Sequence, residues 1–324
     1  MTERARTIFL GSGSFAVPIA EALAHHQAVN LIAVVTAPTR RGSRGRPTDP
    51  PVADWAMARG LPMLRPARLR EPETLAAVAA LEPELLVLAD YGQIVPPALL
   101  ELPVHGALNL HPSLLPRHRG ASPIPATILA GDSETGVSLM RMDAGLDTGP
   151  LIAQAKRPLS DAETAAHLEA QLSLAAASLL AQTLRDWIDG SLGESAQPAE
   201  GATITRPLSR ADGRIDPRLP AFVLERQVRA YQPWPGSYID PGGGRIKIWR
   251  AALRERHDLV PPGTLVRVGG DGIGLTTSDG ILELLEVQPA GGRRMSGADL
   301  LRGRPELVGP IVTEPSAAGR SASG

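Results

Sequence analysis

The sequence predicts an α/β protein, with a mostly parallel sheet in its first part and a small antiparallel β-barrel in its last. Strand and helix patterns alternate through residues 1–189, which is typical of parallel strands joined by crossover helices. The strand segments there are uninterrupted apolar runs, as expected where helices cover both faces of a sheet. A polar stretch follows, and after it short strand patterns succeed one another between turn residues, as in small barrels.

The elements of the first part follow one another in strand–helix order. Strands are predicted at residues 7–10, 31–35, 85–89, 107–110 and 136–142, and helices at 15–25, 52–59, 71–81 and 124–130. The strand at 136–142 alternates apolar and polar residues more than the others, so we expect it at an edge of the sheet. Repetition of this unit predicts a doubly wound, Rossmann-like sheet.

A long helix is predicted after residue 160. Ser160 and Glu163 form a capping-box pattern, and apolar residues then recur at helical spacing from Leu168 to Leu184. Gly190 is placed to end this helix. Its apolar stripe is expected to pack on the sheet.

The last part of the chain changes in pattern. Residues 190–201 are small, polar and contain proline, as linkers do. One helix pattern at 222–231 precedes short strands at 236–240, 245–250, 264–268, 272–277 and 281–287. We therefore predict a first domain at 1–189, a linker at 190–208, an OB-like barrel domain at 209–312 and a disordered tail at 313–324.

Composition excludes several classes of protein and of site. With 43% hydrophobic residues among 324, the chain can bury a core, and with no cysteine it has no disulfide, thiolate nucleophile or thiolate metal site. No apolar run approaches the ~18 residues of a membrane span, and no secretory signal is recognisable. We expect a cytoplasmic monomer without a metal site. The net charge of −1 means that any RNA partner must be held by a local basic patch.

The turn after the first strand, Gly11–Ser14, is a weak match to a dinucleotide-binding loop. The third glycine of that pattern is replaced by Ala16, which variants tolerate. The acidic residue that binds the ribose is missing, because the second strand ends Val34-Val35-Thr36. We therefore interpret the segment as a tight strand-to-helix turn.

A basic segment follows the second strand. Arg40, Arg41, Arg44 and Arg46 place four arginines within seven residues, with no apolar residue between them. Loops after the carboxyl ends of parallel strands face the ligand in such sheets, and guanidinium groups match phosphates. Composition alone leaves two readings open, a solvated loop and contact with phosphate or RNA.

Two polar segments predict the site. If Leu108 and Leu110 point into the sheet, Asn109 and His111 lie together on its other face at the strand end. Asp147 lies in a glycine-rich loop after the next predicted strand and could return to His111 from there. The three residues would form a site without a covalent nucleophile.

Such a set suits transfer of an acyl or formyl group to an amine. An amide donor can stabilise the oxyanion of the tetrahedral intermediate. A base must remove the proton of the attacking amine, whose pKa is about 8, and an acid must protonate the departing nitrogen. The amine is itself the nucleophile, so no serine or cysteine is required.

The sequence of these segments resembles that of a known family. Residues 109–123, Asn-Leu-His-Pro-Ser-Leu-Leu-Pro-Arg-His-Arg-Gly-Ala-Ser-Pro, together with Gly-Leu-Asp-Thr-Gly at 145–149, are similar to the signature of folate-dependent formyltransferases. Residues 229–236 and 288–295 resemble the C-terminal domain of the methionyl-tRNA formyltransferase family. The similarity extends from about Ile8 to Pro305.

The resemblance implies an activity and a set of site residues. In that family 10-formyltetrahydrofolate donates its formyl group to the α-amine of methionine on initiator tRNA. It implies that Asn109, His111 and Asp147 are catalytic. It further implies folate binding by Ser113, Leu114, Leu115 and Pro116, and tRNA binding by Arg40, Arg41, Arg44, Arg46, Arg206 and Arg210.

Two alternatives remain open at this point. The first is a related formyltransferase that acts on a sugar-nucleotide amine, and the second is a noncatalytic RNA-binding relative. The complete set Asn109, His111 and Asp147 counts against the second alternative. Departures from the family pattern at Thr39, His118, Pro207 and Pro217 concern individual tRNA contacts rather than the formyl chemistry.

Overall fold

The chain divides into two compact units. A computed structural model describes residues 4–41, 47–242, 244–255 and 260–311. Unit 1 comprises the residues up to 124, 133–159 and 167–206, and unit 2 comprises 125–132, 160–166 and the residues from 207 on. Each unit contains a buried hydrophobic cluster. The predicted domain limits stay a prediction, and the predicted tail at 313–324 lies outside the described residues.

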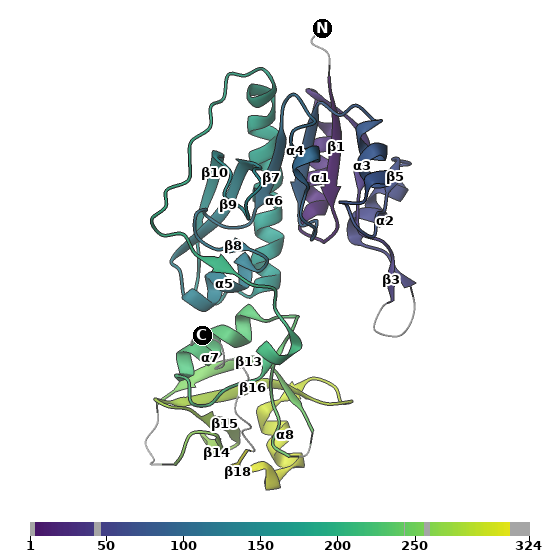
Figure 1. The fold of residues 1–324 in the computed structure, drawn as a ribbon. Helices are drawn as coiled ribbons and strands as arrows, with labels where there is room; N and C mark the ends of the chain where they lie inside the picture. The colour runs from purple at the N-terminus through teal and green to yellow at the C-terminus, as the bar shows by residue number, and fades with distance from the viewer. Residues whose placement is uncertain (1–3, 42–46, 243, 256–259, 312–324) are drawn as a thin grey trace, which may run out of the picture. The chain divides into compact units, whose positions relative to one another are not determined.

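Unit 1 is built on a seven-stranded sheet in the order β10-β9-β7-β6-β1-β2-β5 (Figure 1). The strands are β1 (Ala5–Gly11), β2 (Val29–Val35), β5 (Met63–Leu64), β6 (Leu85–Ala89), β7 (Ala107–His111), β9 (Glu134–Arg141) and β10 (Leu151–Pro158). β1, β2, β5, β6 and β7 run parallel, and β9 and β10 are antiparallel to their neighbours. This confirms the predicted mostly parallel α/β sheet.

The strand predicted at the edge is not the edge strand. β9 lies between β7 and β10, and β10 takes the edge position instead. β9 buries every residue from Thr135 to Met140, as a strand with neighbours on both sides does. β10 escaped detection because its residues are mostly half-buried, so its sequence does not alternate between apolar and polar side chains.

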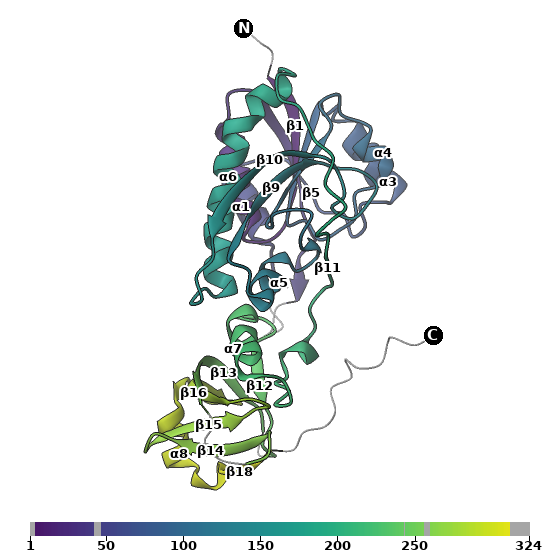
Figure 2. The same ribbon diagram turned by 90° about the vertical axis from the view of Figure 1, so that its left-hand side faces the viewer.

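Helices cover both faces of this sheet. They are α1 (Ala16–His25), α2 (Pro51–Ala58), α3 (Pro72–Ala79), α4 (Pro97–Leu100) and α6 (Ala165–Ile188). Figure 2 shows α1 and α6 on one side of the strands and α3 and α4 on the other. On the α3/α4 side, Ile8 and Leu10 of β1 pack in one cluster with Val78 and Leu99. On the α6 helix, Leu172 is fully buried.

The long helix α6 begins later than the capping-box pattern predicts. The amide N–H of Glu163 donates to the carbonyl of Ser160 at 3.3 Å, which makes a turn ahead of the helix. Helical structure starts at Ala165 and ends at Ile188, and Gly190 follows with a φ of 72°. Glycine takes this left-handed conformation at helix ends without steric cost, as predicted for Gly190.

Two short strand pairs complete unit 1. β3 (Arg40–Arg41) pairs with β4 (Pro47–Thr48), and Asp49 beside this pair accepts hydrogen bonds from Thr39 and, at 2.9 Å, from Arg65. β8 (Arg119–Gly120) pairs in parallel with β11 (Ile204–Thr205). The second pair joins the loop after β7 to the segment that was predicted as the linker.

Unit 2 contains an antiparallel curved sheet that forms a half-barrel, in the order β12-β13-β16-β15-β14-β18, with β17 also paired to β16. The strands are β12 (Ser237–Ile239), β13 (Ile246–Arg254), β14 (Thr264–Val268), β15 (Gly272–Thr276), β16 (Ile281–Pro289), β17 (Met295–Ser296) and β18 (Gly309–Pro310). The five strands predicted from the sequence correspond to β12–β16, which confirms the OB-like class of this part.

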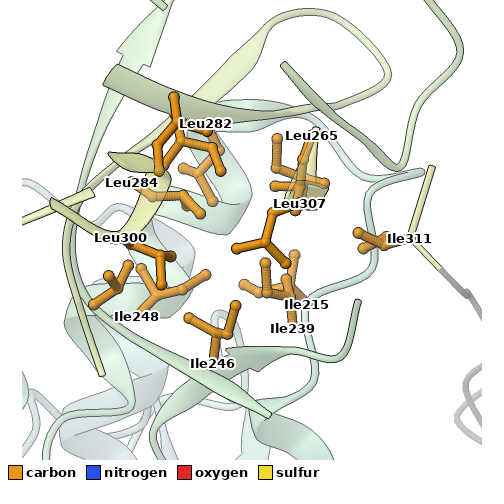
Figure 3. Packing of buried hydrophobic residues seen from close by; sticks show 14 of the residues in the cluster. Ile215, Ile239, Ile246, Ile248, Leu265, Leu282, Leu284, Leu300, Leu307 and Ile311 are labelled. Carbon is orange, nitrogen blue, oxygen red and sulfur yellow. The ribbon is translucent and has the colours of Figure 1, made fainter. Parts of the chain in front are cut away.

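The core of unit 2 is made of branched aliphatic side chains (Figure 3). Ile246 and Ile248 of β13 contribute to it, as do Leu265 of β14 and Leu282 of β16. The described helical segments of this unit are most of α5 (Pro123–Ala130), η1 (Arg210–Gly213), α7 (Ala221–Ala230), α8 (Gly297–Gly303) and η2 (Pro305–Leu307). At the start of β13, Ile246 and Ile248 face this core, so Lys247 and Trp249 lie on the other face of the strand.

The described part of the chain contains no helix long and apolar enough to cross a membrane.

Candidate active site

The strand β7 positions the first two candidate residues. All five of its residues are buried, because β6 pairs on one side and β9 on the other. Leu108 and Leu110 point to one face of the sheet, and Asn109 and His111 point to the other. Asn109 and His111 lie at the carboxyl end of β7, where ligands bind in open α/β sheets.

Asp147 reaches this strand end from the loop after β9. Its Oδ1 accepts a hydrogen bond from Nδ2 of Asn109 at 3.3 Å, and its Oδ2 lies 3.6 Å from Nδ1 of His111. The backbone N–H of Gly120 donates to the same Oδ2 at 2.8 Å. The structure thus brings together the three residues predicted as catalytic, although their roles stay a prediction. Gly120 contributes through its backbone N–H, so its residue type gave no indication of this contact.

The second nitrogen of His111 defines where its proton lies. Nε2 is 2.9 Å from the carbonyl oxygen of His118, which can only accept a hydrogen bond. Nε2 therefore carries a proton, and Nδ1 faces Asp147 either as a lone pair or, in the imidazolium, as a second N–H. Nδ1 is therefore the ring nitrogen of His111 that faces the Asp147 carboxylate, at 3.6 Å from its Oδ2.

The four residues predicted to bind folate form one loop after β7. Ser113 is fully buried, and its Oγ donates to the carbonyl of Arg117 at 2.7 Å. Leu115 is buried as well, whereas Leu114 and Pro116 are half-buried, and the peptide bond between Leu115 and Pro116 is cis. The structure places the loop directly after His111, and its folate contacts stay a prediction.

Two polar residues of the neighbouring strands hold this loop. Oγ of Ser138 in β9 accepts from the N–H of Leu115 at 3.0 Å and donates to the carbonyl of Ser113 at 2.7 Å. Nε2 of Gln154 in β10 donates to the carbonyl of Leu115 at 3.0 Å. Sequence reasoning missed both residues. A serine within the otherwise apolar β9 was an available signal, because a buried hydroxyl needs partners.

The arginines predicted to bind tRNA are spread over separate elements. Arg40 in β3 is exposed, Arg41 is the second residue of that strand, and Arg44 and Arg46 lie outside the described residues. Arg206 follows β11 and is exposed, and the exposed Arg210 begins η1. Their contacts with RNA stay a prediction.

A cluster of cationic and aromatic side chains in unit 2, with a pocket beside it, was not predicted. Arg245 stacks 4.4 Å from the ring centre of Tyr238, and Trp249 has Lys247 at 3.9 Å and Arg294 at 3.4 Å from its ring centre. Burial, and then the charge of Arg294, lower the pKa of Lys247. Of these residues, Tyr238, Arg245 and Lys247 line a pocket with a volume of about 270 Å³, together with Pro235, Gly236, Gln288, Pro289, Ala290 and Gly291.

The sequence did contain a signal for this pocket. Residues 245–250 read Arg-Ile-Lys-Ile-Trp-Arg, and strand alternation puts Arg245, Lys247 and Trp249 on the face opposite the buried Ile246 and Ile248. Basic and aromatic residues that alternate in this way are typical of nucleic-acid-binding surfaces. Among the described residues, no group of three His, Asp or Glu side chains could hold a metal ion.

Comparisons with known proteins agree with this arrangement. Residues 5–184 match the formyl transferase family, and residues 207–305 match the C-terminal domain of formyl transferases. Methionyl-tRNA formyltransferase of Thermus thermophilus is 46% identical over 92% of this chain and 96% of the relative. The enzyme of that name from Myxococcus xanthus is 42% identical over 93% of this chain and 95% of its own.

A solved structure shows the same fold at much lower identity. WlaRD, described as a sugar 3N-formyl transferase in the presence of dTDP and 5-N-formyl-THF, superposes with a TM-score of 0.63 at 16% identity. The likeness covers 87% of this chain and 98% of that one. At that identity the likeness shows the fold alone, whereas the relatives at 42–46% identity extend over both units. The chain therefore belongs to the methionyl-tRNA formyltransferase family.

Proposed function

We propose that the protein transfers the formyl group of 10-formyltetrahydrofolate to the α-amino group of methionyl initiator tRNA. The observation that carries this proposal is the meeting of Asn109, His111 and Asp147 at the carboxyl end of β7. The names and identities of its relatives support the same reaction. The product is the formylated initiator tRNA that begins translation.

Asn109 is suited to hold the formyl oxygen. Its amide nitrogen has two N–H groups, of which one donates to Oδ1 of Asp147. The other can donate to the formyl oxygen as negative charge develops on it, when the amine attacks the formyl carbon. Asn109 is 5% exposed, so this donor acts in a site with little competing water.

The His111–Asp147 pair is suited to carry the proton. An α-ammonium group, with a pKa near 8, must lose a proton before the nitrogen can attack. The pair accepts that proton at the 3.6 Å gap between Nδ1 and Oδ2 and returns one to the nitrogen that leaves on the folate side. Because the amine itself attacks, the site requires no serine or cysteine nucleophile. Its amide, imidazole and carboxylate groups fit the transfer of a formyl group to an amine.

The cluster of cationic and aromatic side chains in unit 2 supports a tRNA substrate. Arg245, Lys247 and Arg294 present three cations over two aromatic rings, and such surfaces bind phosphates and unpaired bases. Together with the predicted contacts of Arg40, Arg206 and Arg210, they supply local basic charge on a chain whose net charge is −1. Local patches of this kind fit one specific RNA better than nonspecific binding.

Location and assembly belong to the same proposal. A role in translation initiation places the enzyme in the cytoplasm, where charged initiator tRNA is found. We take it to act as a monomer, because Asn109, His111 and Asp147 all come from one chain. Sedimentation of the protein at working concentration tests the second point.

The direct test is formylation with purified components. The protein, 10-formyltetrahydrofolate and methionyl initiator tRNA are expected to give formyl-methionine after deacylation, with a rate that falls as salt is raised. His111→Ala and Asp147→Asn are each expected to lower kcat by about 10²-fold or more. Asp54→Asn, an exposed carboxylate on α2, is the matched control and should leave kcat unchanged.

Other substrates decide between the alternatives. A dTDP-linked amino sugar in place of the tRNA tests the sugar formyltransferase activity. Formylation of the sugar and not of the tRNA would overturn the proposed substrate. Tight binding of tRNA without any formyl product would show a noncatalytic RNA-binding protein.

A further inference from the structure

One side chain in the segment between α6 and β11 is set apart from its neighbours. Residues 193–200 are exposed except for Gln197, which is half-buried. Within this stretch of the predicted linker, Gln197 is the residue whose side chain is partly withdrawn from solvent. Its contacts include the backbone of the loop that carries Asp147.

Gln197 uses all the hydrogen-bonding groups of its amide. Nε2 donates to the carbonyl oxygen of Asp147 at 2.9 Å and to that of Gly149 at 2.7 Å. Oε1 accepts from Nε and Nη2 of Arg119 at 3.1 and 2.8 Å. The orientation of the amide is unambiguous, because the carbonyls only accept and the guanidinium only donates.

The loop that Gln197 holds has an unusual backbone. Asp147 has a φ of 53°, a left-handed conformation that is uncommon for residues other than glycine. At Gly149, a Cβ would lie 1.8 Å from the carbonyl oxygen of Arg141, so only glycine fits there. A backbone of this kind persists only when its surroundings hold it.

Asp147 is consequently held from two sides by adjacent residues of β8. The N–H of Gly120 binds its carboxylate at 2.8 Å, and Arg119 holds its carbonyl through Gln197. These contacts fix both ends of the residue that faces His111 and Asn109. A rotation of the Asp147 backbone would move its carboxylate away from both.

Other contacts anchor the segment without Gln197. Glu194 forms two hydrogen bonds with Arg141, at 2.6 and 2.5 Å, and the guanidinium lowers the pKa of that carboxyl. Ser195 exchanges two backbone hydrogen bonds with Leu151, at 2.7 and 2.8 Å. Substitution of Gln197 therefore removes the amide contacts while the segment stays attached.

We propose that Gln197 is a positioning residue for the formyl transfer, acting through the Asp147 loop. The inference rests on the proposed function, since it assigns Gln197 to the same reaction. In this role Gln197 orients the Asp147 carboxylate toward His111 and Asn109, and it does not itself contact the substrate.

Gln197→Glu is the sharpest variant. It keeps the size of the side chain and an acceptor for Arg119, but it places a carboxylate oxygen against the carbonyls of Asp147 and Gly149. We expect kcat to fall by about 10- to 100-fold, because small displacements of catalytic groups cost that much. The KM values for tRNA and folate should change less than about twofold, and the pH profile of kcat should shift.

A double-mutant cycle separates positioning from a general structural role. If Gln197 acts through Asp147, then Gln197→Glu causes no further loss in an Asp147→Asn background. Gln93→Glu is the matched control. The amide of Gln93 also joins backbone groups of unit 1, at Leu69 and Pro66, and its loss should leave kcat and the pH profile unchanged.

A readout independent of turnover completes the test. The NMR titration of the His111 ring is sensitive to the position of the carboxylate opposite Nδ1. The midpoint of this titration should shift in Gln197→Glu but not in Gln93→Glu. If the wild-type enzyme is active and Gln197→Glu changes neither kcat nor the His111 titration, the inference is overturned. It is also overturned if Gln197→Glu lowers kcat by the same factor in the Asp147→Asn background as in the wild type. An inactive wild-type protein would overturn the proposed function instead, and the His111 titration would still decide the role of Gln197.

Discussion

At the scale of single residues, Asp90 is a partly exposed residue whose carboxyl the proposed reaction does not use. It follows β6 with a φ of 45°, and its carboxylate lies over Gly13, where a Cβ would be only 1.8 Å from Oδ2. Burial, and then the charge of Glu169, raise the pKa of Asp90 to about 6 from the ordinary 3.8. The folded protein therefore pays a cost for ionising this group at neutral pH.

The stability of the protein should depend on pH through Asp90. Between pH 3.8 and about 6 the folded state binds more protons than the unfolded chain, so stability falls as pH rises through this window and stays lower above it. Asp90→Asn should raise the free energy of unfolding at pH 7.5 by about 1 kcal/mol, because solvent around this partly exposed residue screens the effect, and the gain should shrink toward pH 4. Asparagine also tolerates the left-handed backbone.

Urea denaturation at several pH values measures this effect. Asp54→Asn, whose carboxylate is exposed, serves as the control and should leave the pH dependence of stability as it is. A gain for Asp90→Asn that is the same at pH 4.5 and pH 7.5 would contradict the assignment of the pH dependence to this carboxyl.

At the scale of elements, β9 carries a glycine at a point of close contact. A Cβ on Gly136 would lie 2.1 Å from the carbonyl oxygen of Ala155 in β10 and 2.6 Å from Cδ2 of Leu114. Gly136→Ala should therefore strain the pairing of β9 with β10 and displace Leu114 in the predicted folate loop. We expect a loss of about 1–3 kcal/mol in the free energy of unfolding, with weaker folate binding.

Thermal unfolding and a folate titration test this prediction together. Gly303→Ala is the control, because no atom lies within 4 Å of a Cβ at this last residue of α8 and alanine favours helix. A Gly136→Ala protein with unchanged melting temperature and unchanged folate affinity would show that β9 and β10 can separate without cost.

The strands of unit 1 show which elements could be predicted from the sequence and which could not. Apolar runs such as Leu85–Ala89 predicted the parallel strands because a strand buried on both faces needs apolar residues throughout. β10 was not predicted, because its residues are mostly half-buried and its sequence shows no alternation of apolar and polar side chains. Asn109 and His111 were found from strand alternation, since their side chains belong to one strand end.

Other parts of the site depend on contacts that no local pattern encodes. The N–H of Gly120 and the carbonyl of His118 act through the backbone, so their side chains carry no signal. Gln197 lies in a segment with the composition of a linker, and 50 residues separate it from Asp147. Only the folded chain brings such groups together.

At the scale of the whole molecule, the chain has two cores in two compact units. Leu265 in β14 and Leu172 in α6 are both fully buried, in unit 2 and unit 1 respectively. Leu→Ala at either position should cost about 2–5 kcal/mol through the lost contacts and the cavity. Leu265→Ala should weaken tRNA binding and leave folate binding intact, and Leu172→Ala should weaken folate binding.

Calorimetry with titrations of folate and tRNA, measured below the first transition, compares the two variants. Each variant serves as the control of the other, because both remove the same three carbon atoms from a fully buried site. Equal loss of folate binding in both variants would contradict the assignment of folate to unit 1 alone.

The pairing of β11 with β8 also couples two stretches of chain that lie far apart in the sequence. β11 ends at Thr205, within the predicted linker, and β8 beside it gives the Gly120 N–H to Asp147. The backbone at Thr205 and the carboxylate of Asp147 are therefore joined through one short pair of strands. A displacement of the chain at β11 would be transmitted to the contact that orients this carboxylate.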